Sequence, residues 1–323
     1  MEKRMNYEEF KNKVMEGFKK YLPEDLQSME LRIKKCKKNN GVAYDGLTMI
    51  GGNKVGESVL PLLYLDNMYE YFLADVKICE DEERALDAMF KYFTNLYVSA
   101  MQERPENVLD LKKESAKKRI VYTLVNTQKN REILDDIPHR EFLDFSIVYR
   151  WVVDMYSEGL QSFVLTNAVL DRLGLTESDL FAMATETTKK ILSPKIIHMN
   201  EMLGEMFAIG GVIPEDEEVE DKLRENGMWI LTNKSHVNGA VMMLDDESLE
   251  ELSHKCDGNF YILPSSVHEV LVLSEKKAPC IKDLRDMVYE VNSTQVLPEE
   301  ILSDNVYYYD KETKSISIAE HMA

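Results

Sequence analysis

The chain has 323 residues, of which 44% are hydrophobic and 30% are charged, a balance typical of a folded globular protein. Its 39 Lys and Arg stand against 58 Asp and Glu, which gives a formal net charge of −19. This charge argues against nucleic acid or an anionic membrane as a partner, because both are bound by clustered basic residues. No apolar run approaches the ~18 residues that span a bilayer, and the first residues are charged rather than apolar. We therefore expect a cytoplasmic protein.

The first part of the chain is predicted to be mainly helical, with one hairpin. Asn6 followed by Glu9 is typical of the capping box that starts a helix. The string Asn39-Asn40-Gly41 supplies the residues of positive φ that a tight hairpin turn needs. The elements expected here are a helix at residues 7–22, strands at 29–37 and 42–50, and helices within 64–96 and at 106–118.

The middle of the chain is predicted to combine strands with a capped helix. Residues 120–125 are β-branched and aromatic, which favours a strand. Residues 142–153 form a second expected strand, which returns through a turn at 157–159 into a third at 160–166. Thr176 and Asp179 resemble a capping box, so we expect a helix from there to Leu192.

The last hundred residues are predicted to alternate between strands and helices. Asp245 and Asp246 are good caps for a helix that Gly258 ends. A second helix is expected at 281–291. The expected strands lie at residues 228–233, 241–244, 259–263, 267–273, 306–309 and 315–318.

Taken together, these elements predict an α+β fold with mostly antiparallel sheets. Two glycines at 210 and 211, followed by a run of acidic residues, are typical of a boundary between domains. We therefore expect an N-terminal α+β region at 1–208, an acidic linker at 209–226 and a C-terminal α+β domain at 227–323.

Four cysteines are present, at positions 36, 79, 256 and 280. They form no Cys-x-x-Cys pair, and no Cys/His group has the spacing of a zinc site. The chain also lacks a P-loop, a dinucleotide-binding glycine motif, an HExxH helix and an EF-hand. We therefore expect no metal and no cofactor.

The segment Pro264-Ser265-Ser266-Val267-His268-Glu269 is the most chemically loaded part of the sequence. A serine beside a histidine can form an activated nucleophile, and a histidine beside a carboxylate can share a metal. If residues 267–273 form a strand, Ser266 and His268 share one face and Glu269 lies on the other. That alternation leaves Ser266 or Ser265 with His268 as the possible catalytic pair, and it separates His268 from Glu269.

The leading hypothesis is a non-enzymatic binding module for a protein or a small ligand, because no complete catalytic constellation is visible. The alternatives are a hydrolase that uses Ser266 or Ser265 with His268, and a metal-dependent enzyme at His268. The candidate ligand-binding residues are polar side chains at predicted strand ends: Asn233, Asn238, Ser265, Ser266, His268 and Glu269.

Several strings resemble an uncharacterised bacterial family, domain of unknown function 5688, found in gut Firmicutes. The most specific of them is Pro264-Ser265-Ser266-Val267-His268-Glu269. The others are Tyr64-Leu65-Asp66, Ile120-Val121-Tyr122-Thr123-Leu124-Val125-Asn126-Thr127, Ile230-Leu231-Thr232-Asn233, Asn238-Gly239-Ala240, Asn292-Ser293-Thr294 and Leu302-Ser303-Asp304-Asn305-Val306-Tyr307. The resemblance covers most of the chain. It implies a cytosolic bacterial protein and no particular activity.

Overall fold

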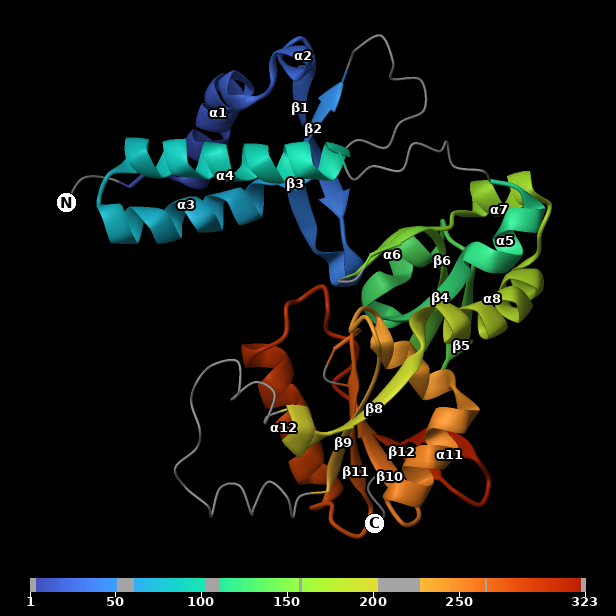
Figure 1. Cartoon of the computed structure of the whole chain (residues 1–323). Helices are drawn as coiled ribbons and strands as arrows, with labels where there is room; N and C mark the ends of the chain where they lie inside the picture. Colours follow the sequence, from blue (N-terminus) through green and yellow to red (C-terminus); the bar gives the residue numbers. More distant parts are fainter. Residues whose placement is uncertain are drawn as a thin grey trace. The chain divides into compact units, whose positions relative to one another are not determined.

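A computed structural model describes residues 4–50, 61–102, 111–156, 159–202, 227–264 and 266–320 (Figure 1). The chain divides into two compact units, Met1–Leu109 and Asp110–Ala323. Both units combine helices with antiparallel sheets, which confirms the predicted α+β class.

The first unit packs helices against a small antiparallel sheet of order β1-β2-β3. Asn6 and Glu9 form the predicted capping box, and Asn40 and Gly41 have the positive φ expected of the hairpin turn. Glu80, at a φ of 55°, separates the two long helices, which lie side by side in Figure 1. The elements are α1 (Tyr7–Gly17), η1 (Phe18–Tyr21), α2 (Glu24–Gln27), β1 (Glu30–Lys37), η2 (Asn39–Gly41), β2 (Ala43–Ile50), β3 (Leu63–Tyr64), α3 (Leu65–Cys79) and α4 (Glu82–Gln102).

The second unit begins with a four-stranded antiparallel sheet in which β6 pairs with β4, β5 and β7. Thr176 and Asp179 form the predicted capping box at the start of α8. Of the helix predicted at 106–118, residues 106–110 lie outside the described residues. The elements are α5 (Lys113–Arg119), β4 (Ile120–Asn126), η3 (Gln128–Asn130), α6 (Arg131–Leu134), β5 (His139–Phe142), β6 (Phe145–Tyr156), β7 (Gly159–Val164), α7 (Asn167–Leu173) and α8 (Glu177–Leu192).

The rest of this unit is a six-stranded antiparallel sheet of order β13-β12-β10-β11-β9-β8. Helix α12 packs on the face that carries Leu263 and Leu273, and α11 packs on the opposite face with Ile262 and Val272. The elements are β8 (Pro194–His198), β9 (Met228–Asn233), η4 (Gly239–Leu244), α11 (Asp246–Lys255), β10 (Phe260–Leu263), β11 (Val270–Ser274), α12 (Ile281–Thr294), β12 (Tyr307–Asp310) and β13 (Ser315–Ile318).

The packing does not follow the predicted division into 1–208, a linker at 209–226 and 227–323. Strand β8 lies before that linker and pairs along its whole length with β9, which lies after it. One hydrophobic core also joins Tyr149 and Trp151 of the first sheet to Phe260 and Tyr309 of the second. The division into compact units instead falls between residues 109 and 110 of the sequence, and the acidic run itself lies outside the described residues.

Two local predictions in the second unit are wrong. Residues 241–244 belong to the 3-10 helix η4 rather than to a strand, because Asn238 turns the chain at a φ of 53° and the apolar run then packs within the core. A short apolar run has no periodicity that separates these two outcomes. Strand β11 begins at Val270 and not at residue 267, so His268 lies in the preceding loop. The expected alternation of Ser266, His268 and Glu269 across a strand therefore does not apply.

An ion pair at the start of α8 links pH to the stability of the second unit. The Arg140 guanidinium donates to both oxygens of Glu177, at 3.0 and 2.9 Å, and the Tyr149 hydroxyl donates to the same carboxylate. Burial by itself raises the pKa of the Glu177 carboxyl, but the hydrogen bonds from Arg140 and Tyr149 outweigh it and lower that pKa below its ordinary value.

Replacing Glu177 by Gln is therefore expected to lower the free energy of unfolding by about 1–2 kcal/mol at neutral pH. Because the folded pKa is depressed, this contribution is complete above the unfolded pKa of about 4.3 and is lost as the pH falls through the folded value. Urea unfolding at pH 7 and below pH 4 checks the effect, with Glu186→Gln on the exposed face of α8 as the control. A Glu177→Gln deficit that stays the same across this range contradicts the assignment.

Candidate functional site

The predicted residues around His268 meet where β9 ends and β11 begins. The chain leaves β9 at Asn233 and turns back through a short loop to Asn238. The backbone N–H of Asn238 donates to Nδ1 of His268 at 3.3 Å. On the other side of the ring, Nε2 of His268 lies 3.2 Å from Oε1 of Glu300.

These contacts assign the tautomer of His268. A backbone N–H can only donate, so Nδ1 must accept and the ring proton lies on Nε2, where it points to the Glu300 carboxylate. Both ring nitrogens thus have partners within the chain. The side chains of His268 and Glu300 are 29% and 32% exposed, so the pair is half-buried.

The candidate nucleophile Ser266 is hydrogen-bonded to the backbone of His268 and not to its imidazole ring. Oγ of Ser266 accepts the backbone N–H of His268 at 3.0 Å, which closes a turn within the loop. A hydrolytic pair requires the serine hydroxyl to donate to a free ring nitrogen. Ser265, the other candidate, lies outside the described residues.

The remaining candidates hold the loop in place. The buried Asn233 side chain donates to the Val237 carbonyl at 2.7 Å and accepts the Ser235 N–H at 3.0 Å. Asn238 contributes its backbone N–H, and the carbonyl of Glu269 accepts the Ser266 N–H at 3.4 Å. The structure therefore brings Asn233, Asn238, Ser266, His268 and Glu269 together, mainly through bonds that join one part of the chain to another.

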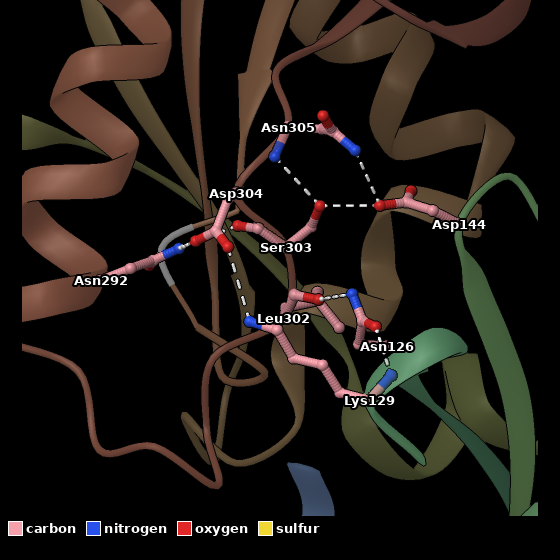
Figure 2. Close-up of polar contacts among 8 residues, drawn as sticks. All are labelled: Asn126, Lys129, Asp144, Asn292, Leu302, Ser303, Asp304 and Asn305. Atoms are coloured by element: carbon pink, nitrogen blue, oxygen red, sulfur yellow. Dashed lines mark hydrogen bonds and ion pairs between the residues drawn. The ribbon is translucent and has the colours of Figure 1, made fainter. Parts of the chain in front are cut away.

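A second polar network, which the sequence reasoning missed, lies on the following segment (Figure 2). The Asp144 carboxylate, in the turn between β5 and β6, accepts three hydrogen bonds. They come from Ser303 Oγ at 2.8 Å, Asn305 Nδ2 at 3.0 Å and the Tyr307 hydroxyl at 2.6 Å. Burial, followed by the bond to Asp144, raises the pKa of Tyr307 well above its ordinary range, so the phenol keeps its proton.

Asn126 and Asn292 hold the same segment from two sides, as Figure 2 shows. Asn126, at the end of β4, donates to the Leu302 carbonyl at 3.1 Å. Asn292, near the end of α12, donates to the Ser303 carbonyl at 2.9 Å and to Asp304 at 2.8 Å. Residues 300–305 thus run from His268 to both sheets. A string such as Ser-Asp-Asn is typical of a turn, but nothing local in it indicates Asp144, 159 residues away.

An open groove of about 680 Å³ lies beside the hairpin of β12 and β13. Its apolar wall includes Ile281, Ile318 and the rings of Tyr261 and Tyr308. Two carboxylates, Glu275 and Glu320, supply its charge, and its described lining residues include no Lys or Arg. Burial, then the hydrogen bond to Glu275, raises the pKa of Tyr308 to about 12, so this phenol stays neutral. The groove is apolar with an acidic rim.

A smaller hollow of about 290 Å³ lies between α8 and the start of α11. Lys189, in its wall, pairs with Asp245 at 3.3 Å and with Glu247 at 2.5 Å. Its charged groups thus already neutralise one another in part. The larger groove is the better candidate for an external ligand.

Two further properties concern the described ranges alone. None of their helices is long and apolar enough to cross a membrane. No group of three or more His, Cys, Asp or Glu side chains within them is arranged to hold a metal ion. His268 with Glu300 therefore remains a pair, without a third ligand of these types nearby.

The fold and the site define a two-unit α+β protein with a hydrogen-bonded histidine loop and an apolar, acid-rimmed groove. The chain belongs to the family of unknown function DUF5688, whose family model matches residues 7–311. This match confirms the resemblance that the sequence strings indicated. No curated protein and no solved structure matches the chain.

Proposed function

We propose that this chain is a non-enzymatic binding protein, and that its groove holds a small ligand with an apolar body and a positively charged group. The observation that carries the proposal is the composition of the groove: apolar and tyrosine walls with two carboxylates and no basic side chain among the described lining. Ligand sites commonly combine an apolar lining with a few polar groups that fix orientation.

The contacts of His268 favour binding over catalysis. A general base needs a ring nitrogen free to take a proton, and both nitrogens of His268 are used by Asn238 and Glu300. Ser266 Oγ accepts the backbone N–H of His268, and no described hydrogen bond joins its hydroxyl to the imidazole. The described candidate atoms, those of Ser266 and His268, are therefore engaged in contacts within the fold.

The groove's chemistry selects the charge of the ligand. Glu320 is exposed at the rim, while Glu275 is oriented by hydrogen bonds from Tyr308 and Asn259. A cation can approach these carboxylates and also lie against a tyrosine face. An anion of the same size meets two like charges, and the described lining residues offer it no basic partner.

Calorimetric titration of the full chain with tryptamine tests this selection, with indole-3-propionate as the matched acid. We expect the amine to bind and the acid to bind at least about tenfold more weakly, since the charge-selective contact is worth about 1–2 kcal/mol. Equal affinity for the two compounds, or binding of neither at millimolar concentration, overturns the proposal.

A pair of variants tests whether the amine binds in the groove. Ile281→Lys, at the start of α12, adds a positive charge to the wall and is expected to abolish amine binding. Met287→Lys makes the same change at a 42% exposed position of the same helix outside the groove, and it should leave the affinity unchanged. Equal losses in the two variants contradict a site at the groove.

A further inference from the structure

The six-stranded sheet has two edges, and their sequences differ. Strand β8, at one edge, carries Pro194 and Lys195, which are typical of edges protected against pairing with another chain. Strand β13, at the other edge, reads Ser-Ile-Ser-Ile and has neither a charge nor a proline within it. Within the described residues, β13 pairs with β12 alone.

The hydrogen-bonding groups on the outer side of β13 can be identified from its register. The Ala319 N–H donates to the Val306 carbonyl, and therefore points toward β12. Successive residues of an antiparallel strand direct their N–H and C=O groups to alternate sides. Ile316 and Ile318 therefore direct theirs away from β12, where no other described strand pairs with them.

We infer that β13 pairs antiparallel with β13 of a second copy of this chain, which makes the protein a homodimer with one continuous sheet. In the register that pairs every outward group, Ile316 lies opposite Ile318 of the second copy, and Ser317 lies opposite its own counterpart. Each copy donates as many backbone hydrogen bonds as it accepts, as a two-fold symmetric interface requires.

The charges that flank the strand match this same register. Lys314 is the turn residue directly before β13, at a φ of 51°, and Glu320 follows the strand by two residues, so antiparallel pairing brings the Lys314 end of one copy beside the Glu320 end of the other, twice by symmetry. Lys314 now pairs with Glu250 at 3.3 Å, but both side chains are more than half exposed, at 64% and 55%. Such a pair contributes little, so Lys314 can exchange it for Glu320 of the second copy.

Apolar surface beside the edge of β13 also favours a second copy of this chain as the partner. Leu143 is 41% exposed and lines the groove together with Ile318. A second strand laid along β13 runs beside this apolar surface and reduces its exposure to water. The two pairs of Lys314 with Glu320 balance each other's charge at the joint, although each copy has a net charge of −19. Salt of about 0.15 M screens the remaining repulsion beyond about 8 Å.

Sedimentation velocity of the full chain over about 5–200 µM measures the equilibrium, and we expect a monomer and a dimer in exchange. Ser317→Lys places two lysines directly opposite each other and should weaken the dimer about fivefold or more. Ser293→Lys, at an exposed position of α12, is the matched control and should leave the equilibrium unchanged. A monomer at every concentration, or a dimer that Ser317→Lys leaves intact, overturns the inference.

A charge exchange tests the register itself. Lys314→Glu and Glu320→Lys should each weaken the dimer, and the double variant should restore it. Failure of the restoration shows that the two residues do not face each other. The groove and the edge of β13 share Ser317, Ile318 and Glu320, so the amine titration is made at a concentration where sedimentation shows a monomer. Sedimentation then measures the dimer and the titration measures amine binding, and either result can fail without the other.

Discussion

Replacing Asp144 by alanine is expected to lower the free energy of unfolding of the second unit by about 3–5 kcal/mol. The Asp144 carboxylate is the shared acceptor for Ser303, Asn305 and Tyr307. Ser303 and Tyr307 are 1% and 0% exposed, so water does not readily replace the lost acceptor. Each donor left unsatisfied in the interior costs about 1–3 kcal/mol, a large share of a domain's stability.

The chain offers a selective probe for this measurement. Its two tryptophans, Trp151 and Trp229, both lie in the second unit, so tryptophan fluorescence during urea unfolding reports on that unit. Glu141→Ala removes an exposed carboxylate from the preceding strand β5 and should change the midpoint little. Asp144→Asn should fall between the two, since it keeps one acceptor oxygen but turns an NH₂ toward neighbouring donors. A normal midpoint for Asp144→Ala contradicts the network of Figure 2.

Local signals in the sequence predicted most of the elements, because each signal acts over a few residues. The Asn6–Glu9 and Thr176–Asp179 capping boxes both form, and residues 315–318 pair with β12 as the expected final hairpin. A cap or a tight turn is satisfied by its own neighbours, so the residue string is sufficient to predict it.

The division into units could not be predicted in the same way. A run of acidic residues indicates that a segment is solvated, but it does not tell whether the strands on its two sides pair with each other. Here β8 and β9 do pair, from Pro194 opposite Asn233 to His198 opposite Trp229. Two strands can thus share one sheet across a long insertion.

The sequence predicted which residues belong to the candidate site but not which contacts they make. Asn238 and His268 were both singled out, but their bond joins residues 30 apart, and Glu300 lies 32 residues beyond the histidine. Because long-range pairing decides which atoms of His268 stay free, its chemistry cannot be read from its immediate neighbours. Asp144 was missed for the same reason, since its three donors lie about 160 residues away.

Among the described glycines of the second unit, Gly239 has the least room for a side chain, so we expect Gly239→Ala to be the most disruptive alanine substitution at these positions. A Cβ atom at this position would lie 2.3 Å from Thr232 Oγ1, 2.4 Å from the His268 carbonyl oxygen and 2.9 Å from the Asn233 nitrogen. Two of these atoms belong to the backbone, so a rotamer change cannot relieve the overlap. The loops must separate, which breaks the 2.8 Å bond from Thr232 to His268.

We expect this change to cost about 3 kcal/mol or more, at the upper end of what overpacking costs. Gly174→Ala is the comparison, because it has open space around it and a φ of 62°, so that only backbone strain of about 1 kcal/mol opposes the substitution. Tryptophan fluorescence during urea unfolding again reports the difference. The ¹⁵N shifts of the His268 ring supply a second readout, since separation of the loops removes the Asn238 donor from Nδ1 and lets the tautomers mix. Equal midpoints for the two variants, with an unchanged imidazole spectrum, would mean that the β9 loop and the His268 loop are not in contact.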